Sequence, residues 1–229
     1  MKIKVAMMWS GGKDSAFALH RVLQDKKYEV CCLLSTFSKE TNRLLMHGVA
    51  EEIIDEQAKS IGLPLIKVFV ENSQVEGYEK AMEIELHKLQ KLGVNTMVFG
   101  DLFLEDLRQY REKNLEKIGA KAYFPLWGMD TKSLINEFIA IGFKTICCCV
   151  NLNVLSEEFL GKIIDNNWVS SLPKEVDPCG ENGEYHSCCI DGPIFKSALS
   201  VENKEVVIKA YPLNEIELKY SFVDIQLHN

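Results

Sequence analysis

The fold of this chain is decided by residues 3–15. Residues 3–9 read Ile-Lys-Val-Ala-Met-Met-Trp, and residues 10–15 read Ser-Gly-Gly-Lys-Asp-Ser. The apolar run predicts a buried strand, and the glycines that follow predict a tight turn into a helix over about residues 15–25. A strand that turns through glycine directly into a helix is typical of α/β proteins, in which helices connect the strands of a parallel sheet.

The same alternation of strand and helix continues through the N-terminal half. Apolar runs predict strands at residues 30–35, 65–70 and 96–99, and apolar positions at helical spacing predict helices at residues 49–61 and 78–92. Because the strands are apolar throughout, rather than at every second position, we expect helices on both faces of the sheet.

The C-terminal half has a different pattern. It contains a predicted helix at residues 131–141 and an apolar strand at residues 144–150, and its tail, residues 194–227, alternates in the manner of antiparallel strands. We therefore predict two domains, a parallel-sheet α/β domain over residues 1–124 and a smaller α+β domain over residues 125–229.

Composition and charge narrow the class of protein. The chain has 229 residues and a formal net charge of -7, and this negative charge argues against nucleic acid as the main partner. No apolar stretch is long enough to cross a bilayer, and the N-terminus lacks the pattern of a secretory signal. We therefore expect a cytoplasmic protein with no membrane partner.

Eight cysteines raise the question of disulfides or a metal site. Most are direct neighbours in the sequence, at residues 31–32, 147–149 and 188–189, and neighbouring residues on a strand point to opposite faces. No Cys-x-x-Cys motif is present, which argues against structural zinc and against a redox pair. We expect reduced thiols that serve as small core residues.

Residues 10–15, called the phosphate loop below, have the chemistry of an anion site. Glycines allow the backbone to approach an anion closely, and free amides at the start of the helix point toward it. Lys13 adds a full positive charge, the two serines add hydroxyl donors, and Asp14 is expected to hold backbone groups or a magnesium ion. A Walker A loop is excluded because Asp14 follows the lysine and Met7 occupies the first glycine position of that motif. The residues expected to contact the nucleotide are Ser10, Gly11, Gly12, Lys13, Asp14 and Ser15.

This six-residue string resembles the signature of the PP-loop ATP pyrophosphatases, members of the adenine nucleotide alpha hydrolase-like superfamily. The resemblance implies a Rossmann-like, HUP-type parallel sheet. It also implies that ATP, with Mg²⁺, is cleaved between its α- and β-phosphates, so that a substrate oxygen is activated as an adenylate and pyrophosphate is released.

Further segments resemble one branch of that superfamily, the diphthine–ammonia ligase family, in an order and spacing that match from residue 5 to about residue 196. The most specific segment, residues 177–187, reads Asp-Pro-Cys-Gly-Glu-Asn-Gly-Glu-Tyr-His-Ser. Its wording, together with that of residues 103–108, looks closest to the prokaryotic-type branch. The other matching segments are residues 46–48, 100–112, 125–127 and 191–195.

Several residues in these segments are candidate ligands of the nucleotide. Asp101 follows a strand end, where a carboxylate contacts a ligand or its magnesium ion, although Asp also favours helix N-caps. Arg108 could neutralise a phosphate or form an exposed helical pair with Glu112. The resemblance also implies that Gly100 and His47 belong to the nucleotide site.

Residues 180–186 concentrate two carboxylates and a histidine around two glycines. From the residues alone, a solvated turn is the preferred interpretation, whereas the resemblance implies a substrate site that binds magnesium, holds an amine or moves protons. Trp127 is expected in the core rather than against a ligand. The residues expected to take part in catalysis are Lys13, Asp101, Glu181, Glu184 and His186, and those expected to bind magnesium are Asp14 and Asp101.

The resemblance implies an ATP-dependent ligase that joins ammonia to a carboxylate, with a modified histidine on a translation elongation factor as acceptor. The negative charge and the absent Cys-x-x-Cys count against an RNA-thiolating enzyme. Two more hypotheses stay open: the same ATP chemistry on a different acceptor, as in a bacterial host without diphthamide, and a non-catalytic nucleotide sensor. A homodimer is also compatible with the sequence, and free ammonium or a partner is expected to supply the nitrogen.

Overall fold

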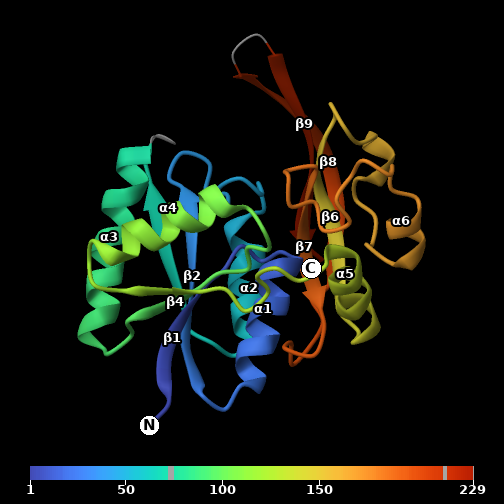
Figure 1. Ribbon diagram of the computed structural model, residues 1–229. Helices are drawn as coiled ribbons and strands as arrows, with labels where there is room; N and C mark the ends of the chain where they lie inside the picture. Colours follow the sequence, from blue (N-terminus) through green and yellow to red (C-terminus); the bar gives the residue numbers. More distant parts are fainter. Residues whose placement is uncertain (72–74, 214–215, 229) are drawn as a thin grey trace.

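The computed structural model describes residues 1–71, 75–213 and 216–228, and its core is built on two sheets (Figure 1). One sheet has five parallel strands from the N-terminal half, and the other has four antiparallel strands from the C-terminal half. The predicted fold class, a Rossmann-like α/β unit with a smaller α+β unit, is therefore confirmed. The division between residues 124 and 125 stays a prediction.

The parallel sheet has the strand order β3-β2-β1-β4-β5. Every neighbouring pair is parallel, and the order is that of a Rossmann-type sheet. The central strand β1 carries Val5, Ala6 and Met7, all fully buried, as expected for a strand that is covered on both faces. The strands are β1 (Ile3–Met8), β2 (Tyr28–Ser38), β3 (Leu65–Val70), β4 (Thr96–Val98) and β5 (Lys121–Tyr123).

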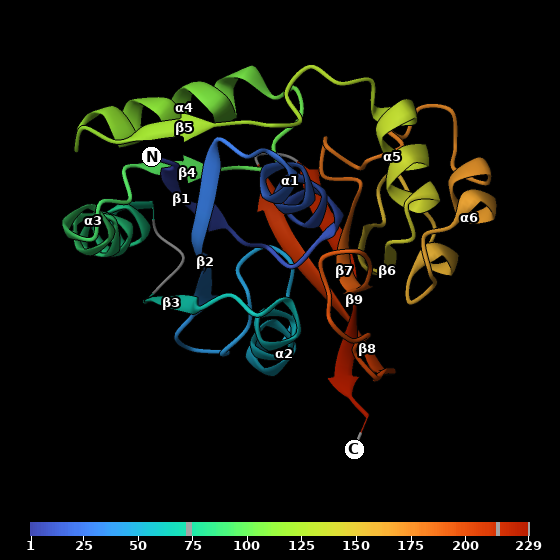
Figure 2. The ribbon, with the colours of Figure 1, turned by 90° about the horizontal axis from the view of Figure 1, so that it is seen from below.

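Helices cover both faces of this sheet (Figure 2). The first two, α1 and α2, lie on the side of the C-terminal half and share one apolar core with it, whereas α3 and α4 contribute to a second core on the opposite face. The end of α2 is set by Gly62, whose left-handed backbone (φ 83°) is a common helix terminator. None of the helices in the described ranges is long and apolar enough to cross a membrane. These four helices are α1 (Lys13–Gln24), α2 (Glu51–Ile61), α3 (Val75–Lys91) and α4 (Glu105–Glu116).

The antiparallel sheet has the strand order β7-β6-β9-β8. The chain tail forms two long strands, β8 and β9, rather than several short ones, and these project as a hairpin beyond the rest of the molecule (Figure 1). Helices α5 and α6 lie on the side of this sheet that faces away from α1 and α2 (Figure 2). The elements of this half are α5 (Thr131–Ala140), β6 (Lys144–Asn151), the 3-10 helix η1 (Glu157–Phe159), α6 (Asn166–Ser170), β7 (Tyr185–Asp191), β8 (Val201–Leu213) and β9 (Ile216–Leu227).

The structure corrects three local predictions. His186 is predicted in a glycine-rich loop but lies on strand β7, which begins at Tyr185. The interpretation of residues 180–186 as a solvated turn is wrong for Glu184 and Tyr185, because both are buried. Trp127 is predicted in the core but is only half-buried.

The cysteines behave as predicted. All eight are free thiols, seven of them buried and Cys31 partly exposed. Burial raises the pKa of the buried thiols, for example to about 11 for Cys32 and about 12 for Cys188. These thiols therefore stay protonated at neutral pH and act as small apolar residues.

Candidate functional site

The phosphate loop lies where β1 turns into α1, at the carboxyl end of the central strand. Gly11 has a left-handed backbone (φ +68°), and Gly12 is the N-cap of α1. The amide of Lys13 donates to Ser187 Oγ at 3.1 Å. Among the hydrogen bonds of the described residues, none uses the amide of a neighbouring loop residue, namely Gly11, Gly12, Asp14 or Ser15. Four free amides at a helix N-terminus form a site for an anion.

A buried glutamine fixes the shape of this loop. The Gln57 amide, on α2, is fully buried, and its nitrogen donates to Gly11 O at 3.0 Å and to Cys189 O at 2.7 Å. Its oxygen accepts from Trp9 Nε1 at 2.9 Å. Gln57 therefore ties the loop to strand β7 of the other sheet. No sequence pattern points to this residue, because one polar residue in an amphipathic helix carries no signal of its own.

Two loop contacts are so close that only glycine fits. A Cβ atom on Gly12 would lie 2.9 Å from Ser187 O, and one on Gly100 would lie 2.8 Å from the backbone carbon of Asp14. Neither glycine has a left-handed backbone, so space rather than conformation is the constraint. Gly100 thus packs the segment after β4 directly against the start of α1.

Lys13 is nearly inaccessible to solvent, with only 3% of its surface exposed. Its Nζ lies 2.8 Å from Asp14 Oδ2 and 5.1 Å from the centre of the Tyr185 ring. Burial disfavours the ammonium charge, but the nearby Asp14, Cys179 and Glu181 together outweigh it, and the net effect raises the pKa of Lys13. Burial also raises the pKa of Asp14, although Lys13 opposes this shift. The loop therefore holds a fixed positive charge beside its free amides.

The two predicted magnesium ligands have similar surroundings. Each forms an ion pair, Asp14 with Lys13 at 2.8 Å and Asp101 with Arg111 at 2.9 Å. Each also has one buried oxygen without a hydrogen-bond partner, Asp14 Oδ1 and Asp101 Oδ2. In residues 1–71, 75–213 and 216–228, no group of three or more His, Cys, Asp or Glu side chains is arranged to hold a metal ion. Because magnesium is commonly held by one or two carboxylates together with substrate phosphates, Asp14 fits such an ion and needs no larger cluster.

Glu181 reaches the same region from the C-terminal half. Its Oε1 accepts a hydrogen bond of 2.8 Å from the amide of Leu102, next to Asp101. Burial, with added repulsion from the Asp14 carboxylate, raises the pKa of Glu181 to about 7. A carboxylate with this pKa gives up and takes protons at neutral pH, which is the property of a general base or acid.

Glu184 points into its own loop rather than toward the phosphate loop. Its Oε1 accepts from the amide of Asp177 at 3.0 Å and from Asn182 Nδ2 at 3.0 Å. Asp177 in turn accepts from the amides of Cys179 at 2.9 Å and Glu181 at 3.3 Å. The Asp177 and Glu184 carboxylates therefore accept hydrogen bonds from amides of their own loop, and the bond to the Glu181 amide holds Glu181 in position. The catalytic role predicted for Glu184 stays a prediction.

Two histidines meet beside the phosphate loop. The rings of His47 and His186 have their centres 4.5 Å apart. Burial, with the nearby Lys13 charge, lowers the pKa of His186 to about 4. Burial and the His186 and Lys13 charges lower the pKa of His47 well below its usual value. Both rings are therefore neutral at pH 7, and His47 Nδ1 is buried without a partner.

Arg108 lies farther along and has other partners. It forms a 2.9 Å ion pair with Glu112, the helical pair that the sequence offered as the alternative. Its guanidinium also lies 4.7 Å from the centre of the Trp127 ring and 5.4 Å from that of Phe124. The nucleotide contact predicted for Arg108 stays a prediction. The residues that the fold does bring together are the phosphate loop, His47, Gly100, Asp101, Glu181 and His186.

Comparison with known proteins identifies the family. Residues 3–122 match the family model for the diphthamide synthase N-terminal domain, and residues 130–220 match the model for the C-terminal domain. The human protein named diphthine–ammonia ligase is 26% identical over 230 residues, which cover 90% of this chain and 85% of that protein. The protein of that name from Schizosaccharomyces pombe is 27% identical over 225 residues, which cover 90% of this chain but 37% of the yeast protein. Because the two family models together span most of its length, the chain belongs to the diphthamide synthase family.

Proposed function

We propose that this chain is an ATP-dependent ligase that activates a carboxylate as an acyl adenylate and then joins the acyl group to ammonia. As a member of a synthase family whose curated relatives are named diphthine–ammonia ligases, the chain is an enzyme of the ligase class. The observation that carries the mechanism is the set of free amides around the buried Lys13, with Glu181 beside it. An anion site next to a group that moves protons is what this chemistry requires.

In the first step, the carboxylate oxygen attacks the α-phosphorus of ATP, and the bond to the β-phosphate breaks. Negative charge then builds on the departing pyrophosphate. The loop amides and the ammonium group of Lys13 stabilise this charge, and they do so from fixed positions because Gln57 and Ser187 hold the loop. A bound magnesium ion, held by Asp14 and the phosphates, would neutralise part of the same charge.

In the second step, ammonia attacks the acyl carbon, and AMP leaves. Ammonia is a nucleophile only when it is neutral, so a base must take a proton from ammonium or from the attacking nitrogen. Glu181 has the pKa for this role, at about 7. The rings of His47 and His186 are neutral, so each can accept a hydrogen bond from the attacking nitrogen without taking its proton.

For the acceptor, the relatives' names point to diphthine, a modified histidine on a translation elongation factor. The carboxylate to be activated belongs to that group, and the reaction would take place in the cytoplasm. In a host that does not make diphthamide, the same ATP chemistry would act on another carboxylate. A homodimer is part of this proposal and does not affect the chemistry.

An RNA-thiolating enzyme is disfavoured by the cysteines. A thiolation mechanism that uses a cysteine nucleophile needs an accessible thiolate, whereas seven of the eight thiols are buried and burial raises their pKa. A nucleotide sensor differs from the proposed ligase in one property, because a sensor binds ATP and releases no pyrophosphate.

One experiment separates the ligase from the sensor. The protein is incubated with ATP, ammonium and an elongation factor that carries diphthine, and nucleotide products are separated by chromatography. We expect continuous formation of AMP and pyrophosphate in equal amounts, which requires both ammonium and the factor and is lost in a Lys13→Met variant. ADP as the main product would contradict the proposed bond cleavage, and tight ATP binding without any product would favour the sensor.

A further inference from the structure

Residues 43–48, called the histidine loop below, lie between β2 and α2 and bring His47 to the phosphate loop. A Cβ atom on Gly12 would lie 3.5 Å from His47 Cε1, so the histidine ring lies directly against the phosphate loop. On either side of His47 the backbone is left-handed, at Met46 (φ 67°) and at Gly48 (φ 71°). A left-handed residue other than glycine is uncommon and needs support from its surroundings. The contacts that hold the histidine loop therefore determine where the His47 ring lies.

Strand β9 of the C-terminal half supplies such contacts. Arg43 Nη2 forms an ion pair of 2.7 Å with Asp224 Oδ1, on β9, and Arg43 Nη1 donates to Gly48 O at 2.9 Å. A Cβ atom on Gly48 would lie 2.9 Å from the ring of Phe222, which is also on β9. One guanidinium group thus joins both ends of the histidine loop to the same strand.

The exposure of this ion pair indicates a role in position rather than in stability. The Arg43 side chain is 35% exposed and that of Asp224 is 17% exposed. Ion pairs near water contribute little free energy to folding, but the planar guanidinium group fixes the direction of both of its contacts. Asp224 is itself held in place, because its Oδ2 accepts from Gln226 Nε2 at 2.7 Å. The histidine loop is thus anchored to a strand rather than to another loop.

We propose that Arg43 is a positioning residue, which holds the His47 ring against the phosphate loop by joining the histidine loop to Asp224. The ring then stays beside that of His186, at 4.5 Å between centres. The effect on turnover rests on the proposed function, in which these rings accept a hydrogen bond from the attacking nitrogen. The effect on the position of the ring does not. In both cases Arg43 acts through His47 and not on the substrate.

A double-mutant cycle tests whether Arg43 acts through His47. Rates of AMP formation are measured over a range of ammonium concentrations for Arg43→Gln, Asp224→Asn, His47→Asn and the double variant Arg43→Gln/His47→Asn. We expect each single change to lower kcat/KM for ammonium about tenfold, because a small misplacement of a positioned group is enough to slow a reaction. The double variant should lose no more than His47→Asn alone, since the position of an absent ring does not matter. Additive losses would overturn the proposal.

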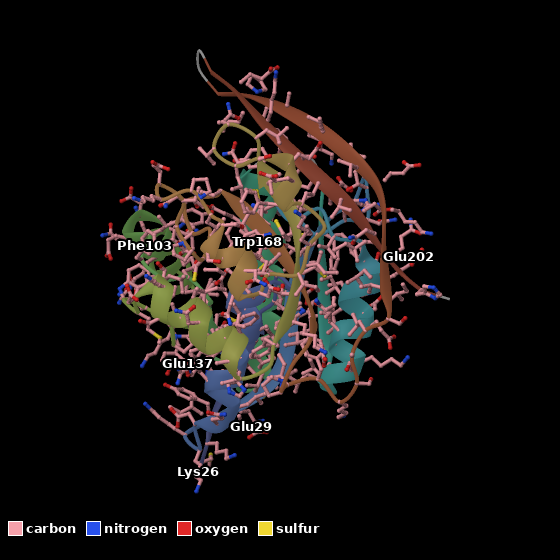
Figure 3. The ribbon with its side chains drawn as sticks, turned by 90° about the vertical axis from the view of Figure 1, so that its right-hand side faces the viewer. Lys26, Glu29, Phe103, Glu137, Trp168 and Glu202 are labelled. Atoms are coloured by element: carbon pink, nitrogen blue, oxygen red, sulfur yellow. The ribbon has the colours of Figure 1, made fainter. Side chains whose placement is uncertain are left out.

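The ion pair between Arg21 and Glu137 offers a matched control. It has the same length, 2.7 Å, and the Arg21 side chain has the same exposed fraction as that of Arg43, 35%. It also joins the two halves of the chain, through α1 and α5. Figure 3 shows Glu137 on the opposite side of the molecule from Glu202, whose strand β8 pairs with β9. Arg21→Gln should therefore leave kcat/KM for ammonium unchanged, and any loss that it shares with Arg43→Gln reflects stability.

A second measurement follows the ring itself and does not depend on turnover. The imidazole signals of His47 are recorded by NMR as a function of pH and are identified by their absence from His47→Asn. Burial, with the His186 and Lys13 charges, lowers the pKa of His47 well below its usual value, so the ring of the unaltered chain should stay neutral at pH 6. In Arg43→Gln the ring should move toward water and gain a proton between about pH 5.5 and 7. The half-exposed His87 is an internal reference.

The two measurements separate this proposal from the proposed function. If the unaltered chain forms no AMP with ammonium and the factor, the proposed function is wrong, and the NMR titration still decides the position of the ring. A His47 ring that stays neutral in Arg43→Gln would overturn the proposal. An equal change of the His47 signal in Arg21→Gln would overturn it as well.

Discussion

Two glycine-rich loops meet at the candidate site, and they use their backbone amides in opposite ways. In the phosphate loop, the amides of four residues donate to no acceptor within the described residues. In residues 177–184, the Asp177 and Glu184 carboxylates accept from the loop's own amides. The phosphate loop is thus held in shape by two residues outside it, Gln57 and Ser187, and its amides stay available to an anion. Residues 177–184 are held in shape by carboxylates of their own segment.

This difference predicts which ligand each loop serves. Free amides and a buried lysine attract a phosphate, whereas amides that already donate to carboxylates of their own loop are not available to bind a phosphate. Because Asp177 and Glu184 hydrogen-bond within residues 177–184, Glu181 is the carboxylate of this loop that extends toward the phosphate loop. The phosphate loop contacts strand β7, which directly follows residues 177–184, because Ser187 lies directly against Gly12 and Lys13.

The largest expected effect comes from removing the charge of the phosphate loop. We expect Lys13→Met to lower kcat/KM for ATP about a thousandfold, roughly 4 kcal/mol of transition-state stabilisation. The exposed Lys39, paired with Glu71, provides the matched control, because Lys39→Met removes an ion-paired lysine at the surface. Calorimetric titration with ATP measures binding of both variants. If folded Lys13→Met binds ATP as the unaltered chain does, the assignment of the phosphate loop is wrong.

Removing the proton carrier of the other loop should cost less and leave ATP binding intact. Glu181→Gln keeps an oxygen for the Leu102 amide, and we expect turnover to fall about a hundredfold, roughly 2.7 kcal/mol. Because the base must be ionised and the pKa of Glu181 is about 7, kcat/KM of the unaltered chain should rise as pH increases through about 7. When kcat/KM is calculated from the concentration of neutral ammonia at each pH, the variant should show a flat profile over this range.

The matched control for this change is Glu52→Gln, an exposed glutamate on α2, which should leave both turnover and its pH dependence unchanged. A pH profile that keeps its rise in Glu181→Gln would mean that another group titrates. Loss of ATP affinity together with turnover would mean that Glu181 belongs to the nucleotide site.

Much of the parallel sheet could be predicted from the sequence, and the reason is burial. β1 and α2 were accessible to prediction because a strand covered on both faces is apolar throughout and a helix covered on one face is apolar at helical spacing. The exposed helix α4 buries only Leu115, so it has no apolar stripe, and β5 has three residues. β7 was hidden by its composition, since its cysteines, histidine and serine are buried without being typical strand residues.

The site could be predicted only in part, because a sequence motif indicates which residues belong to a site but not which residues they contact. The phosphate loop has a recognisable string, and the fold places it as expected at the carboxyl end of β1. Nothing in the sequence indicates that Asp101 pairs with Arg111, or that Gln57 crosses to β7. Such contacts join residues that are distant along the chain, and a single sequence does not record them.

A smaller effect is expected from crowding the contact between β4 and the phosphate loop. A methyl group on Gly100 would lie 2.8 Å from the Asp14 backbone, so Gly100→Ala must displace the loop. We expect ATP affinity to fall about tenfold, roughly 1.4 kcal/mol, within the range of an overpacked contact. Gly119→Ala is the control, because a methyl group there meets nothing within 4 Å but strains a left-handed backbone (φ +69°). It should lower the melting temperature and leave ATP affinity unchanged.

The smallest expected effect on turnover comes from Glu184, and it is the sharpest test of the contrast between the two loops. If Glu184 braces its loop from within, Glu184→Gln keeps the oxygen that accepts from Asp177 and Asn182 and loses only the charge of those hydrogen bonds. We expect unfolding free energy to fall by about 1 kcal/mol and turnover to stay within threefold. If Glu184 is instead a catalytic base, as the sequence resemblance implied, turnover should fall about a hundredfold with little change in stability. Chemical denaturation and the product assay on the same preparation distinguish the two outcomes. A large loss of turnover at unchanged stability would show that both Glu181 and Glu184 take part in catalysis. The proposed difference, in which residues 177–184 use Glu184 to hold their own amides, would then be wrong.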